Sequence, residues 1–71
     1  ITNRLREELK FAENELWVIS SSAEQCHKKL EAYPQLRTLL SKMYMEYKEE
    51  SLSKLGEVVV LKRMLVESEE L

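Results

Sequence analysis

The sequence predicts an all-α protein built from long helices, and three observations support this. The 71 residues include one Gly and one Pro, far fewer than the turns of β-sheets or phosphate-binding loops require. All 13 acidic residues are Glu, which, unlike Asp, does not compete for backbone hydrogen bonds inside a helix. Apolar residues also recur with alternating steps of four and three along most of the chain, which is the spacing of a coiled-coil seam.

The first predicted helix follows an apolar repeat that runs without a slip from residue 5 to residue 33. If Leu9 is placed at position a of a heptad written abcdefg, apolar residues occupy the a and d positions, and Glu, Lys, Arg and Ser fill most positions between them. The a and d residues are Leu5, Leu9, Ala12, Leu16, Ile19, Ala23, Cys26, Leu30 and Tyr33.

The same frame continues beyond Pro34 and predicts a second helical stretch in phase with the first. Its apolar a and d residues are Leu40, Tyr44, Tyr47, Val58, Leu61 and Leu65. Arg37, Ser51 and Lys54 also fall at these positions, and polar residues there are expected to loosen the seam.

Pro34 conflicts with an uninterrupted helix, because it lacks the N–H that would bond the carbonyl of Leu30 and its ring crowds that carbonyl, at a cost of about 3 kcal/mol. We expect an elongated coiled coil of long helices, kinked near Pro34, because the phase survives the proline and no Gly or Asn is present to close the first helix in a left-handed cap. The alternative is an antiparallel helical hairpin that turns at Pro34, pairs Leu9 with Leu61, and dimerises into a helical bundle.

Residues 1–71 are predicted to form a single coiled-coil segment, and we expect it to be a fragment of a longer protein, since it begins at Ile1 and has no signal-peptide layout. The longest apolar runs, 16–19 and 58–61, are four residues each, whereas a membrane span needs about 20. A single cysteine allows no internal disulfide, which favours a reducing, cytoplasmic location.

No enzymatic chemistry is expected, and no catalytic, cofactor-binding or metal-binding residue is predicted. Cys26 and His27 are neighbours, so on a helix they point about 100° apart and cannot hold one ion together. The net charge is −2, with 11 basic and 13 acidic residues mixed along the chain. This pattern lacks the basic stripe that nucleic-acid binding requires.

The apolar repeat indicates contacts between chains, with a homodimer as the first expectation. Apolar residues outside the seam add to this, because clustered exposed apolar side chains mark protein contacts. The residues expected to hold copies of the chain together are Leu5, Leu9, Leu16, Ile19, Leu30, Leu40, Val58, Leu61 and Leu65. The candidates for docking a second protein are Trp17, Val59, Met64 and Val66.

The repeat resembles the broad class of coiled-coil segments in cytoplasmic scaffold and cytoskeletal proteins. The resemblance covers essentially the whole chain and rests on the heptads alone, so it implies oligomerisation and protein–protein interaction without naming a partner. The alternative function is a monomeric helical-hairpin adaptor that docks a partner protein through an apolar face. Neither function involves a cofactor, a nucleic acid or direct membrane insertion.

Overall fold

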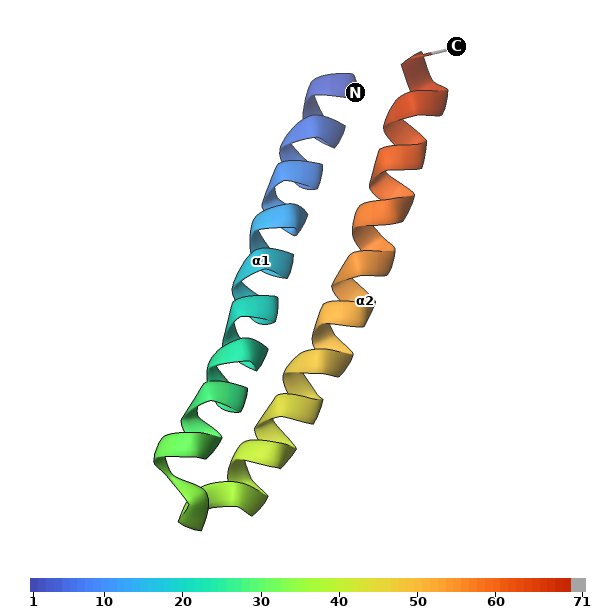
Figure 1. Ribbon diagram of the computed structural model, residues 1–71. Coiled ribbons are helices and arrows are strands. Elements are labelled where there is room, and N and C mark those ends of the chain that lie inside the picture. The colour runs from blue at the N-terminus through green and yellow to red at the C-terminus, as the bar shows by residue number, and fades with distance from the viewer. Residues whose placement is uncertain (70–71) are drawn as a thin grey trace.

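The computed structural model describes residues 1–69 as two long helices. These are α1 (Thr2–Ala32) and α2 (Arg37–Glu69), joined by a short 3₁₀ helix, η1 (Pro34–Leu36). The helices lie side by side and antiparallel, so that the start of α1 and the end of α2 both lie away from the turn (Figure 1). The all-α prediction is confirmed, and residues 1–69 contain no strand.

The chain reverses direction at Pro34, where the sequence allowed a kink or a turn. Helix α1 ends at Ala32, and Tyr33 stands outside both helices with φ −130° and ψ 67°. The Tyr33 N–H donates to the Lys29 carbonyl at 2.8 Å, and the Leu36 N–H donates to the Tyr33 carbonyl at 3.0 Å. Because Tyr33 closes the helix at a negative φ, the turn needs no glycine, and the missing left-handed cap is no obstacle to a hairpin. Of the two arrangements left open by the sequence, this chain has the hairpin.

The predicted heptad frame accounts for which side chains lie between the helices. Every a and d position from Thr2 to Ser68 is buried or half-buried, except Tyr33 and Arg37 beside the turn. The seam of each arm therefore packs against the seam of the other arm. Its most buried residues, each at most 8% exposed, are Leu5, Ala12, Cys26, Leu40, Val58 and Leu61.

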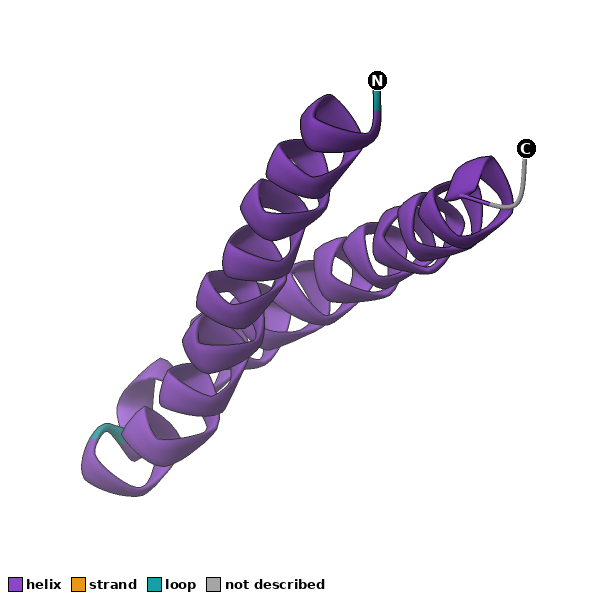
Figure 2. Ribbon diagram, turned by 90° about the horizontal axis from the view of Figure 1, so that it is seen from above, coloured by secondary structure: helices purple, strands orange, loops and turns teal. Residues whose placement is uncertain are grey.

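The hairpin is long and thin, with extents of 56 × 14 × 12 Å and a radius of gyration of 16.2 Å, against about 11 Å for a compact domain of this length. Viewed from above, the two helices are inclined to each other (Figure 2). No large side chain in the described part of the chain is completely enclosed, because two helices share only one side and leave the others open.

Candidate functional site

The residues predicted to hold copies together lie between α1 and α2 of a single chain. A buried cluster lies near the open end of the hairpin, which is the end opposite the turn. It consists of Leu5, Ala12, Val58 and Leu61, with Leu9, Leu16 and Leu65 packed against it. Nearer the turn, Leu40 is buried, and Ile19 and Leu30 are half-buried. Within one hairpin, the a and d residues of α1 and α2 thus already cover each other. Contacts with another chain must use the surfaces beside this seam.

Ion pairs flank the seam on both sides. On one side, residues at e positions join α1 to α2 through Arg6–Glu69 at 2.8 Å and Glu13–Lys62 at 3.6 Å. On the other side, Lys54 reaches residues at g positions, pairing with Glu15 at 3.1 Å and Glu57 at 2.8 Å. Exposed pairs of this kind contribute about 0–1 kcal/mol each, so their main effect is to fix the register of the two helices.

These pairs define two long sides of the hairpin. The e and b positions of both helices lie on one side, and the g and c positions lie on the other. We name them the Leu55 side and the Met64 side, after an e residue and a g residue of α2 that are 46% and 47% exposed. The exposed apolar residues of the Leu55 side are Trp17, Met45, Leu52, Leu55, Val59 and Val66. Those of the Met64 side include Phe11, Val18, Leu39, Val60 and Met64.

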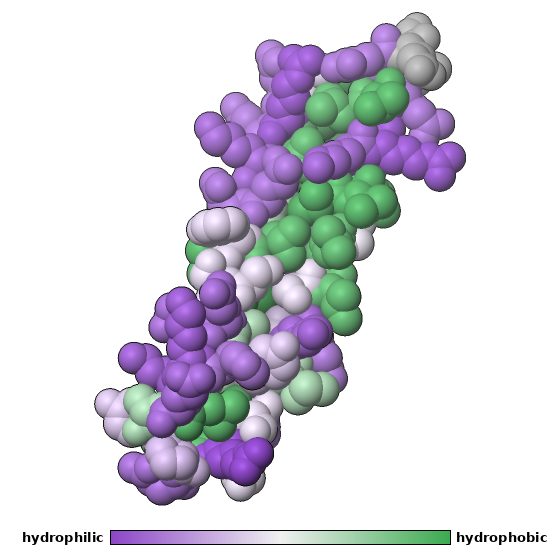
Figure 3. All heavy atoms as spheres, viewed as in Figure 1, coloured by the Kyte–Doolittle hydropathy of each residue, from purple (hydrophilic) through white to green (hydrophobic). Residues whose placement is uncertain are grey.

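The Leu55 side carries a second apolar stripe with heptad spacing. Met45, Leu52, Val59 and Val66 of α2 follow one another at intervals of seven residues, and each is more than half exposed. Trp17 of α1 is 73% exposed and lines a groove with Leu16, Leu55 and Val58, among others. In the view of Figure 3, apolar side chains gather over the half of α2 that leads to the open end.

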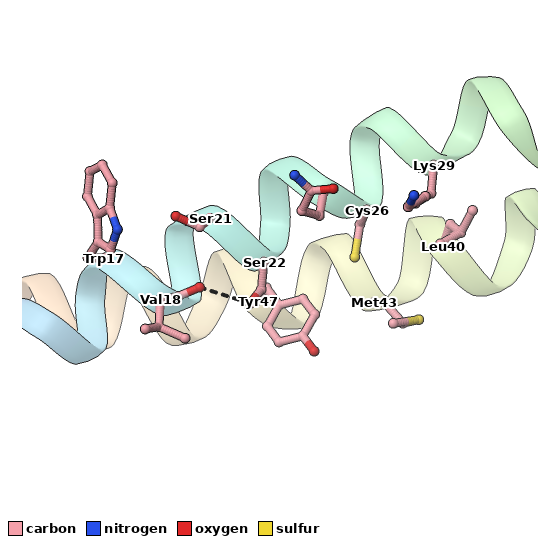
Figure 4. Close-up of a pocket in the computed structure, with 10 residues that line it drawn as sticks. Trp17, Val18, Ser21, Ser22, Cys26, Lys29, Leu40, Met43 and Tyr47 are labelled. Carbon is pink, nitrogen blue, oxygen red and sulfur yellow. Dashed lines mark hydrogen bonds between the residues drawn. The ribbon is translucent and has the colours of Figure 1, made fainter.

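A wider groove of about 470 Å³ lies between the helices in the half nearer the turn, mainly on the Met64 side. Cys26 is buried there, with its sulfur directed toward α2, and Met43 and Tyr47 of α2 line the same groove (Figure 4). Trp17 stands at the rim and points away from α2 (Figure 4). The groove is predominantly apolar and open, so it suits an apolar side chain of another protein better than an enclosed small ligand.

Lys54 is held in its charged form by two ion pairs. Hydrogen bonds from Lys54, chiefly to Glu57 and then to Glu15, raise the pKa of Lys54 above its ordinary value of 10.5. A raised lysine pKa favours the charged form, which suits a salt bridge rather than a catalytic base. Within residues 1–69, no group of three or more His, Cys or acidic side chains is placed to hold a metal ion. Neither described helix contains a stretch long and apolar enough to span a membrane.

The structure separates the four candidates for docking a second protein. Trp17, Val59 and Val66 fall on the Leu55 side, whereas Met64 falls on the opposite side. Sequence reasoning did not select Met45 and Leu52, which complete the stripe. Their spacing of seven and fourteen residues from Val59, at b positions, is the signal that could have identified them.

In comparisons with known proteins, no family model, no curated protein and no solved structure matches this chain.

Proposed function

We propose that this chain is an oligomerisation and protein–protein interaction module, the role that coiled-coil segments fill in cytoplasmic scaffold and cytoskeleton-associated proteins. The observation that carries the proposal is the second apolar stripe of α2, which stays exposed while the first seam is already occupied within the chain. Burying apolar surface is favourable by about 25 cal/mol per Å², and a stripe with seven-residue spacing is the surface that another helix covers. Association is therefore the simplest way to remove the stripe from water.

The exposed area of the hairpin supports a dimer of identical chains. Its accessible surface is 5842 Å², whereas a compact monomer of 8.4 kDa exposes about 4,600 Å². The excess of about 1,200 Å² is comparable with the area that each partner buries in a small obligate homodimer, which starts at about 1,000 Å² per partner. A second copy could therefore bring the surface to the level normal for a folded protein.

Sedimentation equilibrium tests this proposal, with far-UV circular dichroism recorded over the same concentration series. At tens of micromolar we expect a mass about twice 8.4 kDa, and on dilution a loss of helicity together with mass, because the thin core of one hairpin gains stability from its partner. A monomer that stays fully helical throughout the series would contradict self-association.

A monomeric helical-hairpin adaptor is the second candidate function. It is favoured by the pairing of both helices within one chain and by the apolar groove that Val18, Met43 and Tyr47 line. An adaptor would dock a helix of a different protein in that groove. The monomeric outcome of the sedimentation experiment would select it.

A further inference from the structure

We infer that the Leu55 side, and not the Met64 side, receives a second copy of this chain, and that the two hairpins lie face to face with their turns at the same end. In this arrangement α1 of each copy packs against α2 of the other, and the four helices form a bundle. The inference rests on the proposed function, since it states how the proposed dimer is built.

The first argument is the difference in charge between the two sides. The e and b positions of the Leu55 side carry four basic residues, Arg6, Lys10, Lys48 and Lys62, and four acidic residues, Glu13, Glu24, Glu31 and Glu69. The g and c positions of the Met64 side carry Arg4 and Lys29 against Glu8, Glu15, Glu46, Glu50, Glu57 and Glu67. Lys54 pairs with Glu15 and Glu57 on this side, and an excess of acidic residues remains. Two copies that met through the Met64 side would bring like charges together, whereas the Leu55 side is balanced and can complement itself.

The second argument is the placement of apolar residues on the Leu55 side. Trp17 and Leu55 line one groove near the middle of the hairpin, together with the ion pair Glu13–Lys62, and the ion pair Arg6–Glu69 lies further toward the open end. When two such sides meet with their turns at the same end, Trp17 of each copy lies over the apolar stripe of the other copy's α2. An aromatic anchor at the centre of a polar rim is the usual anatomy of a stable interface.

The orientation follows from the signs of the charges around the bundle. With both turns at one end, the four helices alternate as α1, α2, α1 and α2, so Glu13 and Lys62 of the two copies form a ring in which every neighbour has the opposite sign. If one hairpin were inverted, α2 would meet α2 head to tail. Lys48 and Lys62 stand seven residues on either side of Leu55, so an inverted pairing centred on Leu55 would place Lys48 against Lys62 of the second copy. On α1 of the same inverted dimer, Lys10 of one copy would lie toward Glu24 and Glu31 of the other and offset part of this repulsion. The ring of Glu13 and Lys62, which only turns at the same end provide, is therefore what favours that orientation.

A matched pair of substitutions tests which side is used. Leu55→Glu and Met64→Glu each place a carboxylate on α2 at nearly equal exposure, but on opposite sides of the hairpin. By sedimentation equilibrium we expect Leu55→Glu to weaken dimerisation about a hundredfold or more, because a charge would be buried in the interface, and Met64→Glu to leave it within about threefold of the unchanged chain. Circular dichroism at high concentration checks that both variants are helical.

The results separate failure of the inference from failure of the proposed function. If the unchanged chain is a monomer, the proposed function fails and the inference fails with it. If the chain dimerises but Met64→Glu dissociates it and Leu55→Glu does not, the proposed function stands and the assigned side is wrong. Equal weakening by both variants would also overturn the assignment, because it would place neither side alone in the interface.

Cysteine crosslinking tests the orientation. In a Cys26→Ala background, Gln35→Cys places a thiol in the turn and Asn3→Cys places one at the open end, where both native residues are exposed. With turns at the same end, each variant alone should form a covalent dimer with a flexible bis-maleimide whose spacer bridges the width of the bundle, and a mixture of the two should give no turn-to-open-end crosslink. An inverted dimer of a hairpin 56 Å long would show the reverse, with crosslinks only in the mixture, and would overturn the assigned orientation.

Discussion

The two halves of the hairpin follow the same heptad frame but pack differently. Toward the open end, Leu5, Ala12, Val58 and Leu61 form one continuous buried cluster. Toward the turn, Cys26 and Leu40 are buried but lie outside that cluster, and open grooves border the seam there as one does beside Val58. The difference shows that the frame decides which residues face the other helix, whereas the shapes of those residues decide how tightly the helices close.

Tyrosine side chains account for much of the open groove space near the turn, where Tyr47 and Tyr44 line the grooves. Tyr44 and Tyr47 occupy core positions but are only half-buried, because a buried hydroxyl needs a hydrogen-bond partner. The Tyr44 ring lies beside His27, with ring centroids 6.0 Å apart, and the Lys48 Nζ lies 5.6 Å from the centre of the same ring. These polar neighbours keep the ring at the edge of the seam, whereas branched aliphatic side chains in the other half fill the space between the helices.

Truncating one leucine in each half gives the largest expected effects. Leu61→Ala should lower the free energy of unfolding by about 3–5 kcal/mol, because the cluster around it cannot close over the cavity. Leu40→Ala should cost only about 2 kcal/mol, because Leu40 lines an open groove that water can enter. Chemical denaturation monitored by circular dichroism measures both, and equal losses would contradict the proposed difference between the halves.

The helices and their shared seam could be predicted from the sequence because both depend on local spacing. The positions Leu5, Ala12, Val58 and Leu61 follow from the heptad repeat alone, and the structure buries each of them. The hairpin was harder to predict, because Pro34 disfavours the helical conformation at Tyr33 but is compatible with either a kink or a turn. The backbone at Tyr33, with φ −130° and ψ 67°, makes the turn. Only once the hairpin is known can the e and b positions of two separate helices be placed on one side.

Replacing Gly56 measures how far the tight half depends on helix propensity rather than on packing. Gly56 lies at an f position, and a Cβ added there would meet no atom within 4 Å. Gly56→Ala should therefore raise the free energy of unfolding by about 1 kcal/mol through propensity alone. Ser53→Ala, at another exposed position of α2, is the matched control, with an expected gain of about half as much. A much larger gain from Gly56→Ala would mean that helix formation, and not the seam, limits stability in this half.

The smallest expected effect is a pH dependence at Lys54, which lies between the two halves of the seam. Its hydrogen bonds to Glu57 at 2.8 Å and Glu15 at 3.1 Å raise its pKa above the 10.5 of the unfolded chain. The folded state therefore binds the proton more tightly, so the pair stabilises the fold fully below pH 10.5 and loses its effect as the pH rises through the raised pKa.

To isolate the effect of Lys54, the unchanged chain is compared with Lys54→Met, which keeps the length of the side chain and removes its charge. From neutral pH to about pH 10 the difference in unfolding free energy between the two should stay constant, and above pH 10.5 it should shift in favour of the methionine variant. If the two curves remain parallel through the alkaline range, the ion pairs of Lys54 contribute nothing to stability. Lys54 would then interrupt the apolar seam between the two halves without helping to hold them together.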